Sequence, residues 1–393
     1  MLALVWLLYG IFGIIVRAIS PLVTPIIEDL NISFSEMGII LGAWPLTYII
    51  VAAIGGVIMD RWGVRRSLFV GMIIISLSAL LRYFANGFST MFLLVALFGV
   101  GGPMISIGCP KTISQWFSEE DRGKAVGIYM TGPAIGGLLA LSLTNSVVMP
   151  LTGYSWRLTF VIFGLVAFAA ALLWWFLAKD VESTGPTESM SIIKVFKGLA
   201  SIRNVQLILI MGFLAFAIMH GFSNWLPKIL ETGGLTPKVA GFAASIPALV
   251  SIPALLFIPS LVPSRLRERA IAIGYLVLAV VLPVVMVTSG APLITGLVLL
   301  GAVGAFGVPL LMLILMDMPE VGAKYMGSAG GMFFCIGEVG GFAGPFIMGA
   351  LVDLTGSFLI GAYIVAGLSV TVAVMALLLK TKPTSSKTVS SRT

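Results

Sequence analysis

The residues best suited to bind a ligand lie along one side of the first apolar run of this chain. Arg17 is preceded by Gly10 and Gly13 and followed by Ser20 and Thr24, at the steps of three and four that share a helical face. At about 1.5 Å per residue, Arg17 would lie ~15–20 Å from either end of the run, near the middle of a bilayer. A permanent cation at that depth costs at least ~2.5–3.5 kcal/mol unless it meets an anion, a carboxylate or a water-filled cavity.

An arginine presents a fork of donors that can hold a carboxylate or another small oxyanion through two parallel hydrogen bonds. We therefore expect Arg17, Ser20 and Thr24 to bind a small anionic substrate. The alternative is an internal ion pair with Glu338, the only carboxylate well inside an apolar run. Glu338 is accordingly predicted either to carry a proton or to act as the counter-ion of Arg17, and the sequence leaves both roles open.

A second polar stripe occurs in the apolar run near residues 205–229. His220, the only histidine of the chain, is followed one helical turn later by Asn224. A shift of 204 residues carries Arg17 onto Gly221, the neighbour of His220, so the two stripes are expected to face each other. We predict that His220 and Asn224 also bind the substrate, as hydrogen-bond donors or, for the histidine, as a proton carrier. Simple packing of His220 is the alternative.

The elements that position these side chains are predicted to span a membrane. Of 393 residues, 59% are hydrophobic and 10% are charged, whereas a soluble domain carries about 25% charged residues. The chain has twelve runs long enough to cross a bilayer as helices. They lie near residues 4–27, 36–59, 67–86, 90–115, 123–149, 156–178, 205–229, 237–262, 270–288, 291–316, 325–350 and 357–379.

The basic residues predict the orientation of the chain. Seventeen of the 23 lysines and arginines lie in one set of loops or in the tail, and three (Arg157, Lys228 and Lys238) lie in the opposite set. Because cytoplasmic loops are enriched in basic residues, both termini are expected in the cytoplasm. Two further cations, Arg82 and Lys111, lie near the ends of their runs and are expected to extend toward the membrane surface.

A polar stretch divides the chain into six runs plus six. The predicted organisation is an N-terminal bundle (1–178), a cytoplasmic linker (179–204), a C-terminal bundle (205–379) and a cytoplasmic tail (380–393). The halves also repeat under the shift of 204 residues, which maps Gly127, Gly136 and Gly137 onto glycines of the eleventh run. Two repeats of the same orientation favour a substrate site between them near the midplane.

The loop between the second and third runs carries a specific pattern, G-x-x-x-D-R-x-G-x-R-R. The matching residues are Gly56, Asp60, Arg61, Gly63, Arg65 and Arg66. This loop resembles the signature of the major facilitator superfamily of transporters, and the run count, central linker and repeat extend the resemblance over the whole chain. It implies an all-α membrane protein of twelve transmembrane helices in two pseudo-twofold-related six-helix bundles.

The resemblance also implies a cytoplasmic gate. Asp60 would face the N-terminus of the eleventh helix, where the helix dipole favours an anion. Arg61 and Arg65 would pair with the acidic loop Glu119–Asp121 and release it when the cytoplasmic side opens. The alternative is that the loop merely follows the positive-inside rule.

A further motif lies in the fifth run, at Gly132, Pro133, Gly136 and Gly137. It resembles the G-P-x-x-G-G motif often associated with antiporters. Glycines spaced by four let helices approach closely, and proline bends a helix. We interpret it as a helix-packing motif and do not infer antiport from it.

The predicted function is secondary active transport of a small, anionic solute by rocker-switch alternating access. The residues from Arg17 to Leu22 and from Lys111 to Gly123 resemble the cyanate and nitrate/nitrite permease or organic-anion branch. The alternative is a proton-coupled multidrug or metabolite efflux antiporter. A membrane enzyme or a receptor is a third possibility of a different class.

The sequence offers no support for an enzyme. It contains no phosphate-binding G-x-x-x-x-G-K-[ST] loop, no H-E-x-x-H pair and no G-x-S-x-G elbow. No cofactor or metal is therefore expected. The basic residues behind the net charge of +7 lie in short loops between apolar runs, so nucleic acid is not an expected partner. The expected partners are the anionic solute, protons as a possible second ion, and the lipid of the cell membrane, which a multi-pass monomer would cross.

Overall fold

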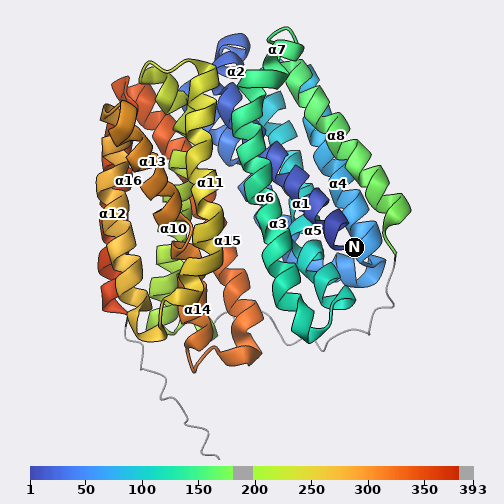
Figure 1. The fold of residues 1–393 in the computed structure, drawn as a ribbon, viewed down its shortest axis with the longest axis vertical. Helices are drawn as coiled ribbons and strands as arrows, with labels where there is room; N and C mark the ends of the chain where they lie inside the picture. Colours follow the sequence, from blue (N-terminus) through green and yellow to red (C-terminus); the bar gives the residue numbers. More distant parts are fainter. Residues whose placement is uncertain (180–197, 380–393) are drawn as a thin grey trace, which may run out of the picture.

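The chain folds into two groups of long helices. A computed structural model describes residues 1–179 and 198–379, and twelve of its helices are long and apolar enough to cross a membrane. Figure 1 shows the first half, in blue to green, beside the second half, in yellow-green to red, with the axes of the long helices roughly aligned. The predicted all-α fold with twelve spans is thus confirmed.

The first half contains six spans, two of which are built from more than one helix. The elements are α1 (Leu2–Ala18), a 3₁₀ turn (Ser20–Leu22), α2 (Val23–Leu30), α3 (Phe34–Trp62), α4 (Val64–Leu81), α5 (Phe88–Trp116), α6 (Glu119–Leu143), a π turn (Thr144–Val148), α7 (Met149–Leu151) and α8 (Trp156–Leu177). The first span is broken because Pro21 has no backbone N–H to donate, so the α-helical ladder is interrupted there.

The second half repeats the pattern. Its helices are α10 (Arg203–Thr232), α11 (Pro237–Leu261), α12 (Arg267–Val287), α13 (Gly290–Gly304), α14 (Gly307–Asp317), α15 (Gly322–Thr355) and α16 (Phe358–Leu378). Together, α13 and α14 form the tenth span. The predicted linker falls mostly on residues 180–197 and the predicted tail on 380–393, outside the described residues, so the domain boundaries stay a prediction.

Polar residues fix where several helices begin at the face predicted to lie away from the cytoplasm, called here the outer face. Ser33 and Glu36 form a capping box: the Ser33 hydroxyl accepts from the Glu36 N–H, and the Glu36 carboxylate accepts from the Ser33 N–H. Ser155, Thr236 and Ser357 cap α8, α11 and α16 in the same way through their hydroxyls. Such caps satisfy backbone donors that the first helical turn leaves unpaired.

The predicted packing motif joins helices within each half. A Cβ added at Gly136 of α6 would lie 2.0 Å from the carbonyl oxygen of Gly10 in α1. Its repeat counterpart, Gly340 of α15, would place a Cβ 2.0 Å from the carbonyl oxygen of Phe213 in α10. No side chain fits at such distances, so both glycines permit close backbone contact between the first and fifth helices of their half.

The structure places Arg82 away from the membrane surface toward which it was expected to extend. Its side chain is 2% exposed, lies over the ring of Phe160 at 4.7 Å, and donates to the Ser78 hydroxyl. The prediction that it extends to the surface was wrong. The chain leaves α4 through a 3₁₀ turn at Arg82, and the side chain folds back between helices.

Candidate functional site

A cavity of about 530 Å³ lies between the two halves. Residues of α1, α3 and α6 from the first half and of α10 to α14 from the second half line it. The location near the middle of the spans agrees with the position expected for a site between two repeats.

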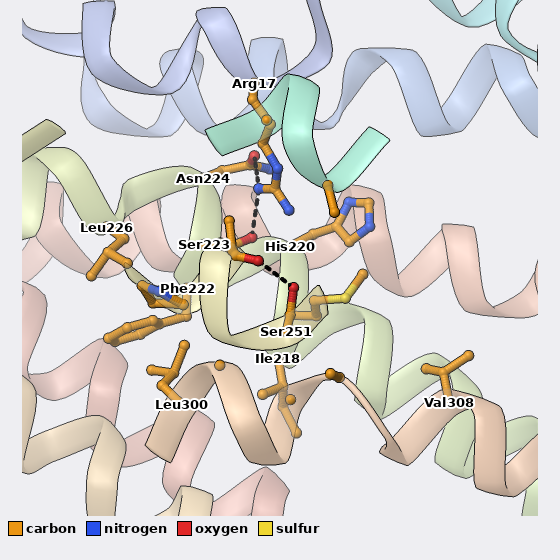
Figure 2. Close-up of a pocket in the computed structure, with 18 of the residues that line it drawn as sticks. Arg17, Ile218, His220, Phe222, Ser223, Asn224, Leu226, Ser251, Leu300 and Val308 are labelled. Atoms are coloured by element: carbon orange, nitrogen blue, oxygen red, sulfur yellow. Dashed lines mark hydrogen bonds between the residues drawn. The ribbon is translucent and has the colours of Figure 1, made fainter. Parts of the chain in front are cut away.

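Arg17 reaches into this cavity from α1. Its Nη1 donates to the Ser223 hydroxyl at 2.8 Å and to the side-chain oxygen of Asn224 at 3.4 Å. Figure 2 shows the guanidinium pointing at these two residues of α10. The side chain is only partly buried, and both partners are neutral. Arg17 forms no ion pair with a described carboxylate, Glu338 included.

His220 completes the polar end of the cavity. Its ring lies between Trp44 of α3, at 5.7 Å and 29°, and Phe216 of α10, at 5.8 Å and 19°. His220 is 8% exposed and lines the cavity together with Asn224. The structure therefore brings Arg17, His220 and Asn224 together, as the repeat predicted.

Ser20 and Thr24 do not line the cavity. Ser20 is 1% exposed, and its buried hydroxyl has no partner in the described part of the chain. Thr24 lies nearer the outer face, where its hydroxyl donates to Glu231 at 2.5 Å and accepts from the Lys228 ammonium at 3.0 Å. For Thr24 the reason is that the predicted common face assumed an unbroken α-helix, whereas three residues of 3₁₀ turn rotate the side chains that follow by about 60°.

Glu338 lies beside the histidine, not beside the arginine. It is 7% exposed, and its Oε2 has no hydrogen-bond partner among the described residues. A Cβ built on Gly341 would lie 2.8 Å from this oxygen and 3.2 Å from Nδ1 of His220, so both groups adjoin the same glycine.

Several lining residues were missed by sequence reasoning. Ser223 is the nearest partner of Arg17, and its position next to Asn224 was the available signal. Trp44 contacts His220 from the other half, and nothing in its local sequence distinguishes it from an interfacial anchor. Tyr275 and Ser251 also line the cavity. The Ser251 hydroxyl donates to the Ala248 carbonyl of its own helix at 2.7 Å.

The predicted gate motif is only partly described. Gly63 separates α3 from α4 with a φ of +80°, a conformation that glycine adopts without strain. Arg65 lies over the Trp175 ring at 4.8 Å and donates to the Trp175 carbonyl. Arg61 and Arg66 are exposed. The surroundings of Gly56 and the side chain of Asp60 lie outside what the structure describes, so the gate stays a prediction.

Known relatives cover nearly the whole chain. The hexuronate transporter of Bacillus subtilis is 26% identical over 389 residues, spanning 92% of this chain and 89% of its own. A putative tartrate transporter of Agrobacterium vitis is 24% identical over 376 residues, spanning 90% of this chain and 86% of its own. The probable galactarate/D-glucarate transporter GudP of Escherichia coli is 24% identical over 396 residues, spanning 89% and 86%.

Solved structures share the fold. A D-xylose-proton symporter superimposes with a TM-score of 0.77 at 16% identity, over 95% of this chain and 96% of its own. A bacterial homolog of the human lysosomal transporter Spinster superimposes with a TM-score of 0.71 at 15% identity, over 96% of this chain and 94% of its own. The family model of the Major Facilitator Superfamily matches residues 5–345. The chain therefore belongs to the Major Facilitator Superfamily, and it is a multi-pass membrane transporter, not an enzyme.

Proposed function

We propose that this protein is a secondary active transporter of a small organic anion, whose anionic group binds at Arg17. The observation that carries the proposal is the partly buried guanidinium in the cavity, whose hydrogen-bond partners among the described residues are the neutral side chains of Ser223 and Asn224. A cation at this depth is strongly favoured to acquire an anion. Because no described carboxylate pairs with it, the substrate can supply that charge.

The relatives support the substrate class. Hexuronate, tartrate and galactarate or glucarate, the substrates in their names, are all organic acids. The alternative of drug efflux is disfavoured for apolar cations, because the Arg17 guanidinium in the cavity would repel them.

The contacts between the halves support alternating access. Hydrogen bonds that join the halves in the described part of the chain cluster at Arg17 and at the outer face, where Thr24 meets Glu231 and Ser35 meets Asp353. The residues of α11, α12 and α14 that line the cavity lie near the middle of their spans, away from these outer-face contacts. This arrangement favours an inward-facing conformation, from which the halves would rock to open the other side.

We further propose that Glu338 takes up a proton coupled to transport. It is buried and unpaired in the described structure and lies beside His220. A buried carboxyl without a cationic partner is stable when protonated and costly when charged. The counter-ion role is not favoured in this conformation because Arg17 has other partners.

Flux in proteoliposomes tests the proposal. A panel of labelled carboxylates is offered to the wild type, to Arg17→Ala and to Arg82→Met, which removes a second buried arginine away from the cavity. We expect uptake of at least one acid by the wild type and by Arg82→Met. Arg17→Ala should lose about 10- to 100-fold, because a hydrogen bond to a charged group is worth ~1.5–3 kcal/mol. Efflux of organic cations that survives Arg17→Ala, or the absence of any anion flux, would contradict the proposal.

A further inference from the structure

We infer that the substrate is an amphipathic monoanion, with one oxyanion headgroup at Arg17 and a hydrocarbon body, and not a polyhydroxylated sugar acid. The inference rests on the proposed function, because it assumes that Arg17 holds an anion. It goes beyond the relatives, whose names point to hydroxylated acids.

The polar groups of the cavity gather at one end. Arg17, His220, Ser223 and Asn224 converge there, and Figure 2 shows them on one side of the cavity. These groups can satisfy a single headgroup with several lone pairs. Three of these groups are already engaged with one another, since Arg17 donates to both Ser223 and Asn224.

The remaining wall is apolar. Phe12, Trp44 and Phe216 contribute aromatic rings near the polar end. Leu278, Leu300 and Val308 belong to the part formed by α12, α13 and α14, and Figure 2 shows Leu300 and Val308 across the cavity from Arg17. A substrate that fills this space places most of its surface against hydrocarbon.

Two hydroxyl groups, of Ser251 and Tyr275, interrupt this wall among the described residues, and together they provide little polar surface. Ser251 gives its hydrogen to the Ala248 carbonyl and so keeps only a weak acceptor for a ligand. Tyr275 is 6% exposed, and the other described lining residues of α12 to α14 have no polar side chain. One phenol can satisfy one polar substituent, but not the several hydroxyls of a sugar acid.

The chemistry of the wall decides between the two substrate types. Each substrate hydroxyl that loses water without gaining a partner lowers affinity by about 5- to 100-fold. Each methylene buried against the wall instead raises affinity by about fourfold. The volume of about 530 Å³ lies in the range of small-molecule sites and exceeds what a headgroup alone would fill.

The inference is tested by equilibrium binding to the purified full-length protein in detergent. The probes are cyclohexanecarboxylate and phenylacetate as apolar acids, glucuronate and tartrate as hydroxylated acids, and phenylacetamide as an uncharged analogue. We expect the apolar acids to bind at least about 10-fold more tightly than glucuronate. Phenylacetamide should show no Arg17-dependent binding.

A polar substitution in the wall sharpens the test. Val308→Thr changes one methyl into a hydroxyl at nearly constant size. It should reduce the preference for phenylacetate over glucuronate by about 3-fold or more. Val298→Thr makes the same change at a residue of α13 that is 38% exposed and outside the cavity lining, and it should leave the preference unchanged.

The outcomes separate this inference from the proposed function. If glucuronate or tartrate binds more tightly than the apolar acids, and Arg17→Ala abolishes that binding, the inferred substrate class is wrong and the proposed function stands. If no acid binds in an Arg17-dependent way, the proposed function fails and the inference fails with it. Tight, Arg17-dependent binding of the apolar acids supports both.

Discussion

At the residue scale, two arginines of the membrane spans have opposite surroundings. Arg17 meets neutral partners and a cavity, whereas Arg82 is 2% exposed against Phe160, with Nε and Nη1 unpaired in the described structure. Burial of a cation therefore does not by itself identify a binding site. The cation must also have access to a space that a ligand can enter.

The surroundings of Arg82 predict an unusual stability effect. Arg82→Met keeps the length of the side chain and removes a charge with two unsatisfied nitrogens, and such replacements are often neutral or stabilising by ~1–4 kcal/mol. We expect its apparent Tm in detergent to equal or exceed that of the wild type. Arg82→Ala should lower the Tm, because it also removes packing on Phe160. Equal losses in both variants would show that the charge itself stabilises the fold.

The ring stack around His220 allows packing to be separated from binding. His220→Phe keeps a ring between Trp44 and Phe216, so we expect its Tm to stay close to that of the wild type. It removes both ring nitrogens, and anion affinity should fall by about 5- to 20-fold if the imidazole donates to the substrate. His220→Ala should lose both stability and affinity. Unchanged affinity in His220→Phe would mean that the histidine only packs.

At the element scale, close helix pairs are built twice from the same glycines. Gly136 and Gly340 are related by the shift of 204 residues and make equally close contacts with α1 and α10. Gly127 and Gly331 are related by the same shift, and a Cβ on either would meet no atom within 4 Å in the described structure. The repeat thus supplies its own matched controls.

These four positions give a paired prediction. Gly136→Ala and Gly340→Ala should each destabilise their half by ~1–3 kcal/mol, because the helices must separate to admit a methyl group. Gly127→Ala and Gly331→Ala should be neutral or slightly stabilising, since alanine favours a helix. Tm in detergent and yield of folded protein measure the effect. Equal behaviour of all four variants would contradict the packing role of the motif.

The elements also show how far the sequence can predict the site. Length and hydropathy were enough to identify twelve spans, and the repeat was enough to predict that His220 and Asn224 lie near Arg17. The rotation of side chains beyond Pro21 was not predictable, because the hydropathy of a run does not report a 3₁₀ turn within it. Thr24 was placed in the site for that reason, whereas Ser20, which begins the turn, is buried away from the cavity. Trp44 and Tyr275 were missed because an aromatic residue at a membrane-buried position carries no signal of what it faces.

At the scale of the whole molecule, one carboxylate joins the ends of two antiparallel helices from different halves. Asp353, near the end of α15, accepts from the backbone N–H groups of Phe34 and Ser35 at 3.0 and 2.7 Å and from the Ser35 hydroxyl. An anion at the N-terminus of α3 also interacts favourably with its dipole. These contacts join the two halves at the outer face.

Weakening this contact should shift the conformational equilibrium. Asp353→Asn removes the charge, worth ~1–2 kcal/mol, and should favour the outward-open state by about 5- to 30-fold. Ser251→Cys in a Cys335→Ser background reports cavity access from the cytoplasm, since Cys109 is buried. Its labelling by an impermeant maleimide in inside-out vesicles should slow down.

Asp29→Asn is the matched control for this shift. Asp29 is also an outer-face carboxylate, but it pairs with Arg157 of its own half. Its removal should leave the labelling rate unchanged. If Asp353→Asn and the wild type are labelled by the maleimide at the same rate, the Asp353 carboxylate does not hold the halves together.

The stack of Trp44 on His220 joins an indole from one half to an imidazole from the other. Emission from an indole depends on the rings and the polarity around it, so separation of the halves should alter the fluorescence of this one tryptophan among eight. The difference between wild type and Trp44→Phe would isolate that signal. Stopped-flow recording of this tryptophan fluorescence would then follow the separation of the halves during transport, without any added label.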